Sequence, residues 1–174
     1  MLEVSGLSVC YGERRVLREL NLRVERGQTL AVVGESGTGK TTLGLAVMRL
    51  LEERGDGVDV EGTIRVEGIE VNDLSPDELQ ELRWQKIAMV FQNAEEALNP
   101  VYTIIRQVTE PLTAHGVPDE AAGQKAREAL EKVGYPLERL DAYPHQLSLG
   151  ERQRVLIAMA FVCDPDLVIL DEPT

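Results

Sequence analysis

The stretch that decides the fold of this 174-residue chain is Gly34-Glu35-Ser36-Gly37-Thr38-Gly39-Lys40-Thr41. It fits the pattern G-x-x-x-x-G-K-S/T, whose glycines let the backbone curl until successive N–H groups point inward at phosphate oxygens. Apolar residues 29–33 precede it and predict a short buried strand, and residues 40–53 follow it and predict an amphipathic helix. Strand, loop and helix in this order predict a phosphate-binding loop.

The last residues of this loop carry the reactive side chains. We predict that the Lys40 ammonium group contacts the β and γ phosphates of a nucleotide and that the Thr41 hydroxyl coordinates Mg²⁺. The helix that begins near Lys40 adds its positive N-terminal end, and we count Thr42 among the nucleotide-binding residues. By itself, the loop fits kinases, GTPases, helicases and transport ATPases alike.

A second motif lies near the end of the sequence, in Leu167-Val168-Ile169-Leu170-Asp171-Glu172. Its apolar residues predict a strand that carries two adjacent carboxylates at its C-terminal tip. Ligands bind at that edge of a parallel sheet. We therefore predict that Asp171 holds the Mg²⁺ shell and that Glu172 polarises the attacking water.

Strand-like runs alternate with helical stretches, which predicts an α/β domain. The expected strands cover residues 2–9, 16–24, 29–33, 62–71, 87–91 and 167–170. The expected helices cover residues 40–53, 76–84, 103–143 and 150–163, the third broken near Gly116 and again near Gly134. Ser75 and Glu78 predict a capping box at the start of the second helix.

The composition is that of a folded protein with an acidic surface. Thirty acidic residues against 18 basic ones give a formal net charge of −12. This charge repels phosphate backbones, so nucleic acid is not an expected partner. The same charge also fits a simple requirement for solubility.

The cysteines and the longest apolar run indicate neither a disulfide bond nor a membrane-spanning helix. Cys10 and Cys163 lie far apart in apolar stretches, which predicts two small buried residues and no disulfide bond. The longest apolar run, residues 155–163, is much shorter than a membrane-spanning helix. Contact with a membrane is therefore expected only through a partner.

With these motifs in place, the whole chain resembles the ATP-binding cassette ATPases. The stretch that carries the resemblance furthest is Leu147-Ser148-Leu149-Gly150-Glu151-Arg152-Gln153-Arg154, which is similar to the family signature LSGGQ-x-QR. The resemblance implies that ATP is the nucleotide. It also implies that Ser148 and Gly150 meet the γ-phosphate of ATP held by an opposite subunit, and a helix N-terminus suits that task.

Three further features match the family. Gln92 matches the Q-loop glutamine, which in the family senses the Mg²⁺ site and carries coupling to the transmembrane subunit, and Asp171-Glu172-Pro173-Thr174 matches the Walker B ending. Tyr11 lies where the family places an aromatic residue that stacks on adenine, although a strand aromatic packed on the core also fits it. The resemblance thus implies three catalytic residues, Glu172, Lys40 and Gln92.

Two short strings point to a subfamily. Leu98-Asn99-Pro100 follows the Q-loop and Tyr143-Pro144-His145 precedes the signature, as in the ATPases that import peptides and nickel. The resemblance implies a P-loop NTPase fold with a RecA-like core, an N-terminal antiparallel β subdomain and an inserted α-helical signature subdomain. Residues 1–174 would then be a single domain, incomplete at its C-terminus, with residues 1–92 and 164–174 in the core and residues 93–163 in the helical part.

The sequence departs from the family pattern in two places. Leu149 replaces the first glycine of the signature and Glu151 replaces its glutamine, and a leucine adds bulk where the backbone should pass close to a phosphate. The chain also stops at Thr174, before the family's D-loop and H-loop histidine. In related ATPases a following strand enters the centre of the sheet, so we expect a gap with unpaired backbone groups and a fragment that is unstable and hydrolyses ATP poorly.

The function implied by the resemblance is the ATP-hydrolysing motor of a transporter that imports peptides or nickel. The expected partners are transmembrane permease subunits, a second ATPase subunit that is identical or different and, indirectly, a solute-binding protein, at the cytoplasmic face of the cell membrane. One alternative is a remnant that binds nucleotide without turnover. Another is a non-transport cassette ATPase, but the coiled-coil members of that class insert hundreds of residues between the loop and the signature.

Overall fold

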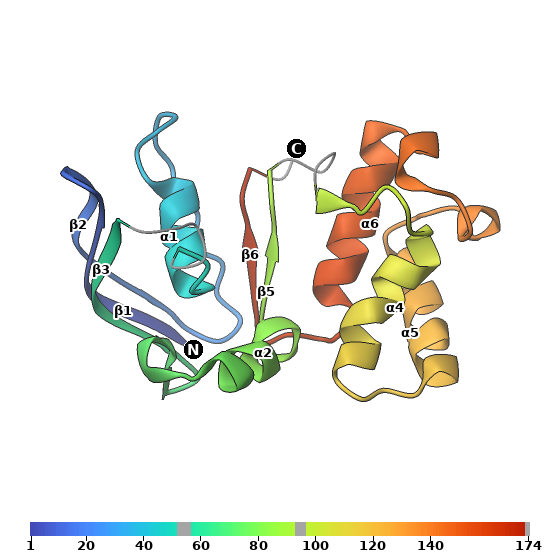
Figure 1. Ribbon diagram of the computed structural model, residues 1–174, viewed down its shortest axis with the longest axis horizontal. Coiled ribbons are helices and arrows are strands. Elements are labelled where there is room, and N and C mark those ends of the chain that lie inside the picture. The colour runs from blue at the N-terminus through green and yellow to red at the C-terminus, as the bar shows by residue number, and fades with distance from the viewer. Residues whose placement is uncertain (52–56, 93–96, 173–174) are drawn as a thin grey trace. The chain divides into compact units, whose positions relative to one another are not determined.

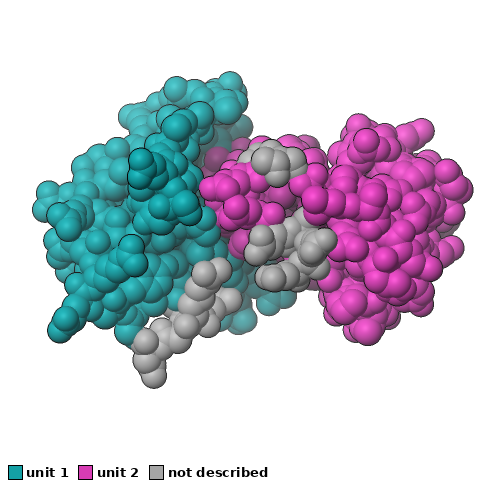
Figure 2. Space-filling model, turned by 90° about the horizontal axis from the view of Figure 1, so that it is seen from above, with its two compact units in different colours: residues 1–83 teal, residues 84–174 magenta. Residues whose placement is uncertain are grey.

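The computed structural model describes residues 1–51, 57–92 and 97–172. The chain divides into two compact units, residues 1–83 and 84–174 (Figure 2). Among the sequence expectations, the far end of the helix at residues 40–53 and the motif residues Pro173 and Thr174 lie outside the described residues. The predicted division into a core and a helical part concerns both units together and stays a prediction.

Unit 1 is built on an antiparallel sheet with the strand order β2-β1-β3-β4 (Figure 1). Its strands are β1 (Leu2–Tyr11), β2 (Arg14–Val24), β3 (Val58–Val66) and β4 (Ile69–Glu70). The central strand β1 pairs with both β2 and β3, and it buries Leu2, Val4, Leu7 and Val9. Gly12, with φ at 57°, reverses the chain between β1 and β2. The predicted antiparallel strands of this half are confirmed.

Helices α1 (Lys40–Val47) and α2 (Pro76–Gln85), with the short η2 (Val71–Asp73), complete this half of the chain. The capping box at α2 is confirmed, because Ser75 N–H and Oγ both donate to Glu78 Oε2, at 2.8 and 2.7 Å. The expected extent of α1 was wrong. The helix ends at Val47 because Arg49 adopts a left-handed φ of 51° and Arg83 donates to the carbonyl oxygens of Met48 and Arg49.

The buried strand expected at residues 29–33 is also wrong. Within the described ranges these residues form no strand, and the exposed fractions are 47% for Leu30, 50% for Val32 and 92% for Val33. A strand forms only where neighbouring backbone supplies the ladder bonds, whatever the β propensity of its residues. The described strands pair only within the orders β2-β1-β3-β4 and β5-β6.

Unit 2 combines a helical bundle with two parallel strands. Its helices are α4 (Ile104–Ala114), α5 (Asp119–Lys132) and α6 (Leu149–Phe161), with the short η3 (Leu137–Arg139) and η4 (Pro144–Gln146) before α6 (Figure 1). The predicted breaks are confirmed, with φ at 79° for Gly116 and 71° for Gly134. The bundle packs on a core that includes the fully buried Ile104, Val108 and Val155.

The two strands of unit 2 are β5 (Ile87–Val90) and β6 (Leu167–Leu170). They pair in parallel with Ile87 opposite Leu167 and Val90 opposite Leu170, so their carboxyl ends lie at the same edge. Helix α6 contacts β5, α4 and α5, which anchors the strand pair to the bundle.

Both cysteines are free and half-buried rather than fully buried, and burial raises the pKa of the Cys163 thiol. In the part of the chain that the structure describes, no helix has the length and apolar character to cross a membrane.

Gln107 on α4 holds the loop that follows the Q-loop, and this predicts a stability effect. Its side chain is 3% exposed, accepts the Asn99 N–H at 2.8 Å and donates to the carbonyl oxygens of Asn99 and Tyr102. Gln107→Leu should lower the free energy of unfolding of unit 2 by about 1–2 kcal/mol, because the part-buried backbone groups of Asn99 and Tyr102 lose their partners. Urea unfolding followed by the fluorescence of Trp84, the single tryptophan, measures the change.

The matched control is Gln124→Leu on α5, whose exposed amide bonds only the neighbouring Glu128 side chain. It should change the unfolding free energy by less than about 0.5 kcal/mol. Equal effects of the two substitutions would contradict the bracing role of Gln107.

Candidate active site

The glycine-rich loop curls in front of α1 and is closed by its own side chains. Lys40 Nζ donates to the carbonyl oxygens of Gly34 and Glu35, at 2.9 and 2.8 Å, and Thr38 Oγ1 donates to Glu35 O at 2.8 Å. The ammonium charge is therefore held over the curled backbone, which is where the sequence predicts phosphate groups.

Two glycines of the loop are required by close packing. Gly39 has φ at 101°, and a Cβ added there would lie 2.8 Å from Leu17 Cδ2 and 3.0 Å from Val16 Cγ1 of β2. A Cβ on Gly34 would lie 2.9 Å from Thr38 Oγ1. Glycine is therefore favoured at Gly39 by both its φ and its packing, whereas a Cβ at Gly34 would displace the Thr38 hydroxyl from its bond to Glu35 O.

The N-terminus of α1 is suited to an anion. Gly39 is the N-cap residue and has no side chain to bond the first N–H groups of the helix. Thr41 and Thr42 lie in this first turn and are half-buried, whereas Glu35, Ser36 and Gly37 are exposed. Backbone donors at a helix N-terminus bind phosphate well, so the cradle fits the triphosphate.

Tyr11 is the last residue of β1, in the same unit as the loop. It pairs with Arg14 of β2 and Val58 of β3 and is half-buried. This placement agrees with both interpretations of Tyr11, and stacking on adenine stays a prediction.

In unit 2 the parallel strand pair brings two predicted catalytic side chains together. Asp171 continues the ladder through its N–H to Val90 O at 3.0 Å and is 8% exposed. Glu172 follows with a left-handed φ of 49°, an unfavourable conformation for a residue with a Cβ. Gln92 Nε2 donates to Glu172 Oε2 at 2.6 Å. The turn after β6 therefore places the Glu172 carboxylate within hydrogen-bonding distance of Gln92, which lies two residues beyond the end of β5.

The signature residues form the start of α6. Ser148 is the N-cap residue, and its N–H and Oγ donate to Glu151 Oε2 at 2.8 and 2.7 Å, while Glu151 N–H donates back to Ser148 Oγ at 3.3 Å. Ser148 is thus the N-cap residue of α6, with Glu151 closing a capping box. Leu149 is 54% exposed, so its extra bulk lies at the surface.

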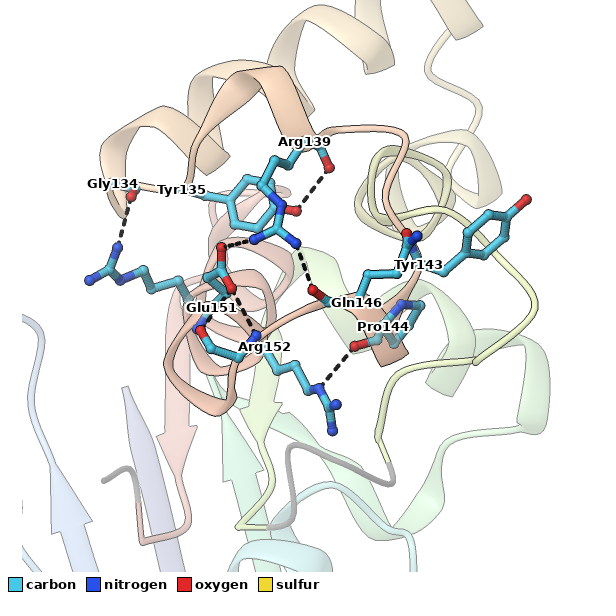
Figure 3. Close-up of polar contacts among 10 residues, drawn as sticks. Gly134, Tyr135, Arg139, Tyr143, Pro144, Gln146, Glu151 and Arg152 are labelled. Atoms are coloured by element: carbon cyan, nitrogen blue, oxygen red, sulfur yellow. Dashed lines mark hydrogen bonds and ion pairs between the residues drawn. The ribbon is translucent and has the colours of Figure 1, made fainter.

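Sequence reasoning missed one residue of this cluster, Arg139. Its Nη1 donates to Glu151 Oε1 at 2.5 Å and its Nη2 to Gln146 O at 2.6 Å (Figure 3). The Ser148 hydroxyl and N–H, together with Arg139, hold the pKa of Glu151 below its ordinary 4.5. The available signal was the acid at a position where the family has a neutral glutamine, because such an acid needs a counter-charge.

The structure places the predicted site residues in both units. The loop and Tyr11 lie in unit 1, and Gln92, Ser148, Gly150, Asp171 and Glu172 lie in unit 2. The proposed Mg²⁺ ligands Thr41, Gln92 and Asp171 offer a hydroxyl, an amide oxygen and a carboxylate, which suit this hard cation. No group of three His, Cys, Asp or Glu residues in the described ranges forms a metal cage by itself. Each of these donors, taken by itself, is an oxygen ligand of the kind that Mg²⁺ accepts.

Comparison with known proteins identifies relatives along the full chain. The sequence model of the family described as ABC transporter matches residues 17–174. The oligopeptide transport ATP-binding protein OppD of Bacillus subtilis is 41% identical over 181 residues, which cover 100% of this chain and 50% of that protein. The glutathione import ATP-binding protein GsiA of Salmonella typhimurium is 42% identical over 185 residues, covering 100% of this chain and 30% of that protein. The chain thus spans half or less of the length of these relatives.

Two solved structures share the fold. They are described as a dimeric post-hydrolysis state of the ATP-binding cassette MJ0796 bound to ADP and Pi, and as dimeric MJ0796, a bacterial ABC transporter cassette. Each matches with a TM-score of 0.87 and 31% identity, over 100% of this chain and 75% of that chain. The match confirms the predicted α/β fold class, with its antiparallel β subdomain and helical signature subdomain.

The capping box of α6 predicts a pH-dependent stability. Because the folded pKa of Glu151 lies below 4.5, its carboxylate contributes stability that is present above this pH and is lost as the pH falls through the folded pKa. Glu151→Gln keeps the capping geometry but removes the charge. The variant should be less stable than the wild type near neutral pH, and the difference should shrink as the pH falls below about 4.5. Urea unfolding at a series of pH values measures it, and a difference that does not vary with pH would refute the assignment.

Proposed function

The chain belongs to the ABC transporter family, and on that premise we propose that it is the ATP-binding and ATP-hydrolysing motor of a membrane transporter that imports peptides or nickel. The names of the relatives, which specify oligopeptide transport and glutathione import, favour peptides. The proposed location is the cytoplasmic face of the membrane, where the chain binds permease subunits and works with a solute-binding protein only indirectly, through those subunits.

The observation that carries this proposal is the closed loop in front of α1. Lys40 Nζ already bonds two oxygen atoms, the carbonyls of Gly34 and Glu35, at 2.9 and 2.8 Å. Anionic oxygens of a triphosphate are stronger acceptors than carbonyls, so we expect the β and γ phosphates to replace them. The uncapped N–H groups of the first turn then bind the remaining phosphate oxygens.

Hydrolysis is assigned to the carboxyl edge of β5 and β6. Glu172 accepts a proton from water as the water oxygen attacks the γ-phosphorus, and the bond from that phosphorus to the ADP oxygen breaks. Gln92 donates to Glu172 Oε2 at 2.6 Å and so restrains the base. Thr41, Asp171 and Gln92 would hold Mg²⁺, which neutralises phosphate charge when bound.

A second ATPase subunit is proposed to receive the signature helix. Gly150 lies in the first turn of α6, and within the described part of the chain a Cβ on it would meet nothing within 4 Å. Glycine in a helix costs about 1 kcal/mol relative to alanine, and no packing in this chain requires it. Close approach of a phosphate from outside explains the choice, and the dimers described for MJ0796 support it.

The role of the loop in ATP binding can be tested through Lys40. Lys40→Ala removes the ammonium group from the loop and should weaken ATP binding by at least about tenfold, because a charge-assisted contact is lost. Titration calorimetry with ATP and Mg²⁺ measures the affinity. Lys132→Ala, at the end of α5, is the matched control and should bind as the wild type does. Unchanged affinity in Lys40→Ala would exclude the loop as the nucleotide site.

The second prediction concerns turnover in the full-length protein. Glu172→Gln should keep ATP binding, reduce hydrolysis by roughly 10²- to 10⁴-fold and accumulate an ATP-bound dimer, because the base is lost and the phosphate contacts remain. Phosphate release and sedimentation measure these effects, and Glu120→Gln in the exposed first turn of α5 serves as the control. Normal hydrolysis by Glu172→Gln would show that another group is the base. Binding without turnover in the wild type would favour the nucleotide-binding remnant.

A further inference from the structure

The start of α6 carries an acid beside the groups proposed to bind phosphate. Glu151 Oε2 lies 2.8 Å from Ser148 N and 2.7 Å from Ser148 Oγ. A carboxylate at this position opposes an incoming phosphate in two ways: it repels the phosphate charge, and it accepts the hydroxyl hydrogen that Ser148 would donate. A functional clamp therefore needs a group that offsets Glu151.

Arg139 is placed to do this. Arg139 Nη1 donates to Glu151 Oε1 at 2.5 Å (Figure 3). Arg139 Nη2 donates at 2.6 Å to the carbonyl oxygen of Gln146, which lies in the segment before α6. The side chains of Arg139 and Glu151 are 37% and 18% exposed, so the pair is only partly screened by water.

The backbone beneath Arg139 is also anchored. The Tyr135 hydroxyl donates to Arg139 O at 2.9 Å, and Tyr135 is 3% exposed. By contrast, Arg152 and Arg154 of α6 donate to the backbone carbonyls of Pro144 and Gly134. Arg139 therefore reaches Glu151 from η3, an element outside α6. Its backbone carbonyl is bonded to the buried Tyr135.

We propose that Arg139 is a positioning residue of the signature clamp, which offsets the charge of Glu151 so that the helix start accepts a nucleotide phosphate. The inference rests on the proposed function, because it assumes that Ser148 and Gly150 meet ATP. It explains how the chain uses an acid where the related signature has a neutral amide. With the pair at net zero charge, the N-terminal N–H groups of α6 leave a positive potential at the helix start.

A purely structural clamp makes a different prediction. If Arg139 only fastened the helix start through Gln146 O, its loss would be equally harmful whatever residue stood at position 151. If it only fastened the helix start through Glu151, the free energy of unfolding in urea would show the same dependence on residue 151 as turnover does. If it offsets a charge, its loss is harmful only while the acid is present. The two roles are separated by a double-mutant cycle.

The cycle measures ATP turnover by the full-length protein in its transporter assembly, with Mg²⁺ present. The variants are Arg139→Gln, Glu151→Gln and the double substitution, with Arg139→Lys as the charge-conserving variant. Arg139→Gln should reduce turnover about tenfold when Glu151 is present, and less than about twofold in the Glu151→Gln background. Arg139→Lys should recover part of the loss. Arg154→Gln removes an arginine that bonds a carbonyl, and it should act equally in both backgrounds.

Equal losses from Arg139→Gln in the two backgrounds would overturn the inference and leave the proposed function standing. No turnover by the wild type, or wild-type turnover by Lys40→Ala, would overturn the proposed function and the inference with it. If Arg139→Gln does not fold, Arg139→Met, which also removes the charge and keeps an unbranched side chain, takes its place in the cycle and the same comparison decides.

Discussion

The close approach of Gly39 to strand β2 is the constraint on which the nucleotide site depends. A Cβ at Gly39 would lie 2.8 Å from Leu17, so the turn that starts α1 exists only because this residue has none. The turn sets the direction of α1 and places Lys40 where its ammonium group reaches back to the carbonyls of Gly34 and Glu35. The loop shape and the placement of the Lys40 charge in unit 1 are thus tied to the close packing of Gly39 on strand β2.

In unit 2 the predicted catalytic side chains are positioned by the parallel pairing of β5 with β6. Because β5 and β6 run in the same direction and in register, the residues that follow them emerge at one edge. Gln92 and Glu172 are 80 residues apart in sequence, yet their side chains share a hydrogen bond of 2.6 Å. The left-handed backbone at Glu172 is the local cost of this arrangement, and strained residues of this kind cluster at functional sites.

Glutamic acid in place of glutamine at position 151 of the signature helix adds a negative charge to the start of α6. A glutamine in the capping box is neutral, whereas Glu151 brings a charge to the place where the family receives phosphate. The chain meets this charge with Arg139, which lies on a different element and bonds the backbone before α6 as well as the acid. An acid in the signature is therefore compatible with the fold and has a defined electrostatic partner.

The sequence by itself determined the features that depend on local chemistry. These are the loop of residues 34–41, the capping box at Ser75, the helix breaks at Gly116 and Gly134, and the strand that is followed by Asp171 and Glu172. Capping, turns and glycine conformations involve residues a few positions apart, so short patterns contain them. Tertiary structure alone decided that residues 29–33 form no strand, that α1 ends at Val47, and that Arg139 pairs with Glu151. These outcomes depend on ladder partners, carbonyl contacts and counter-charges supplied by distant segments, and no local pattern encodes which segments will lie there.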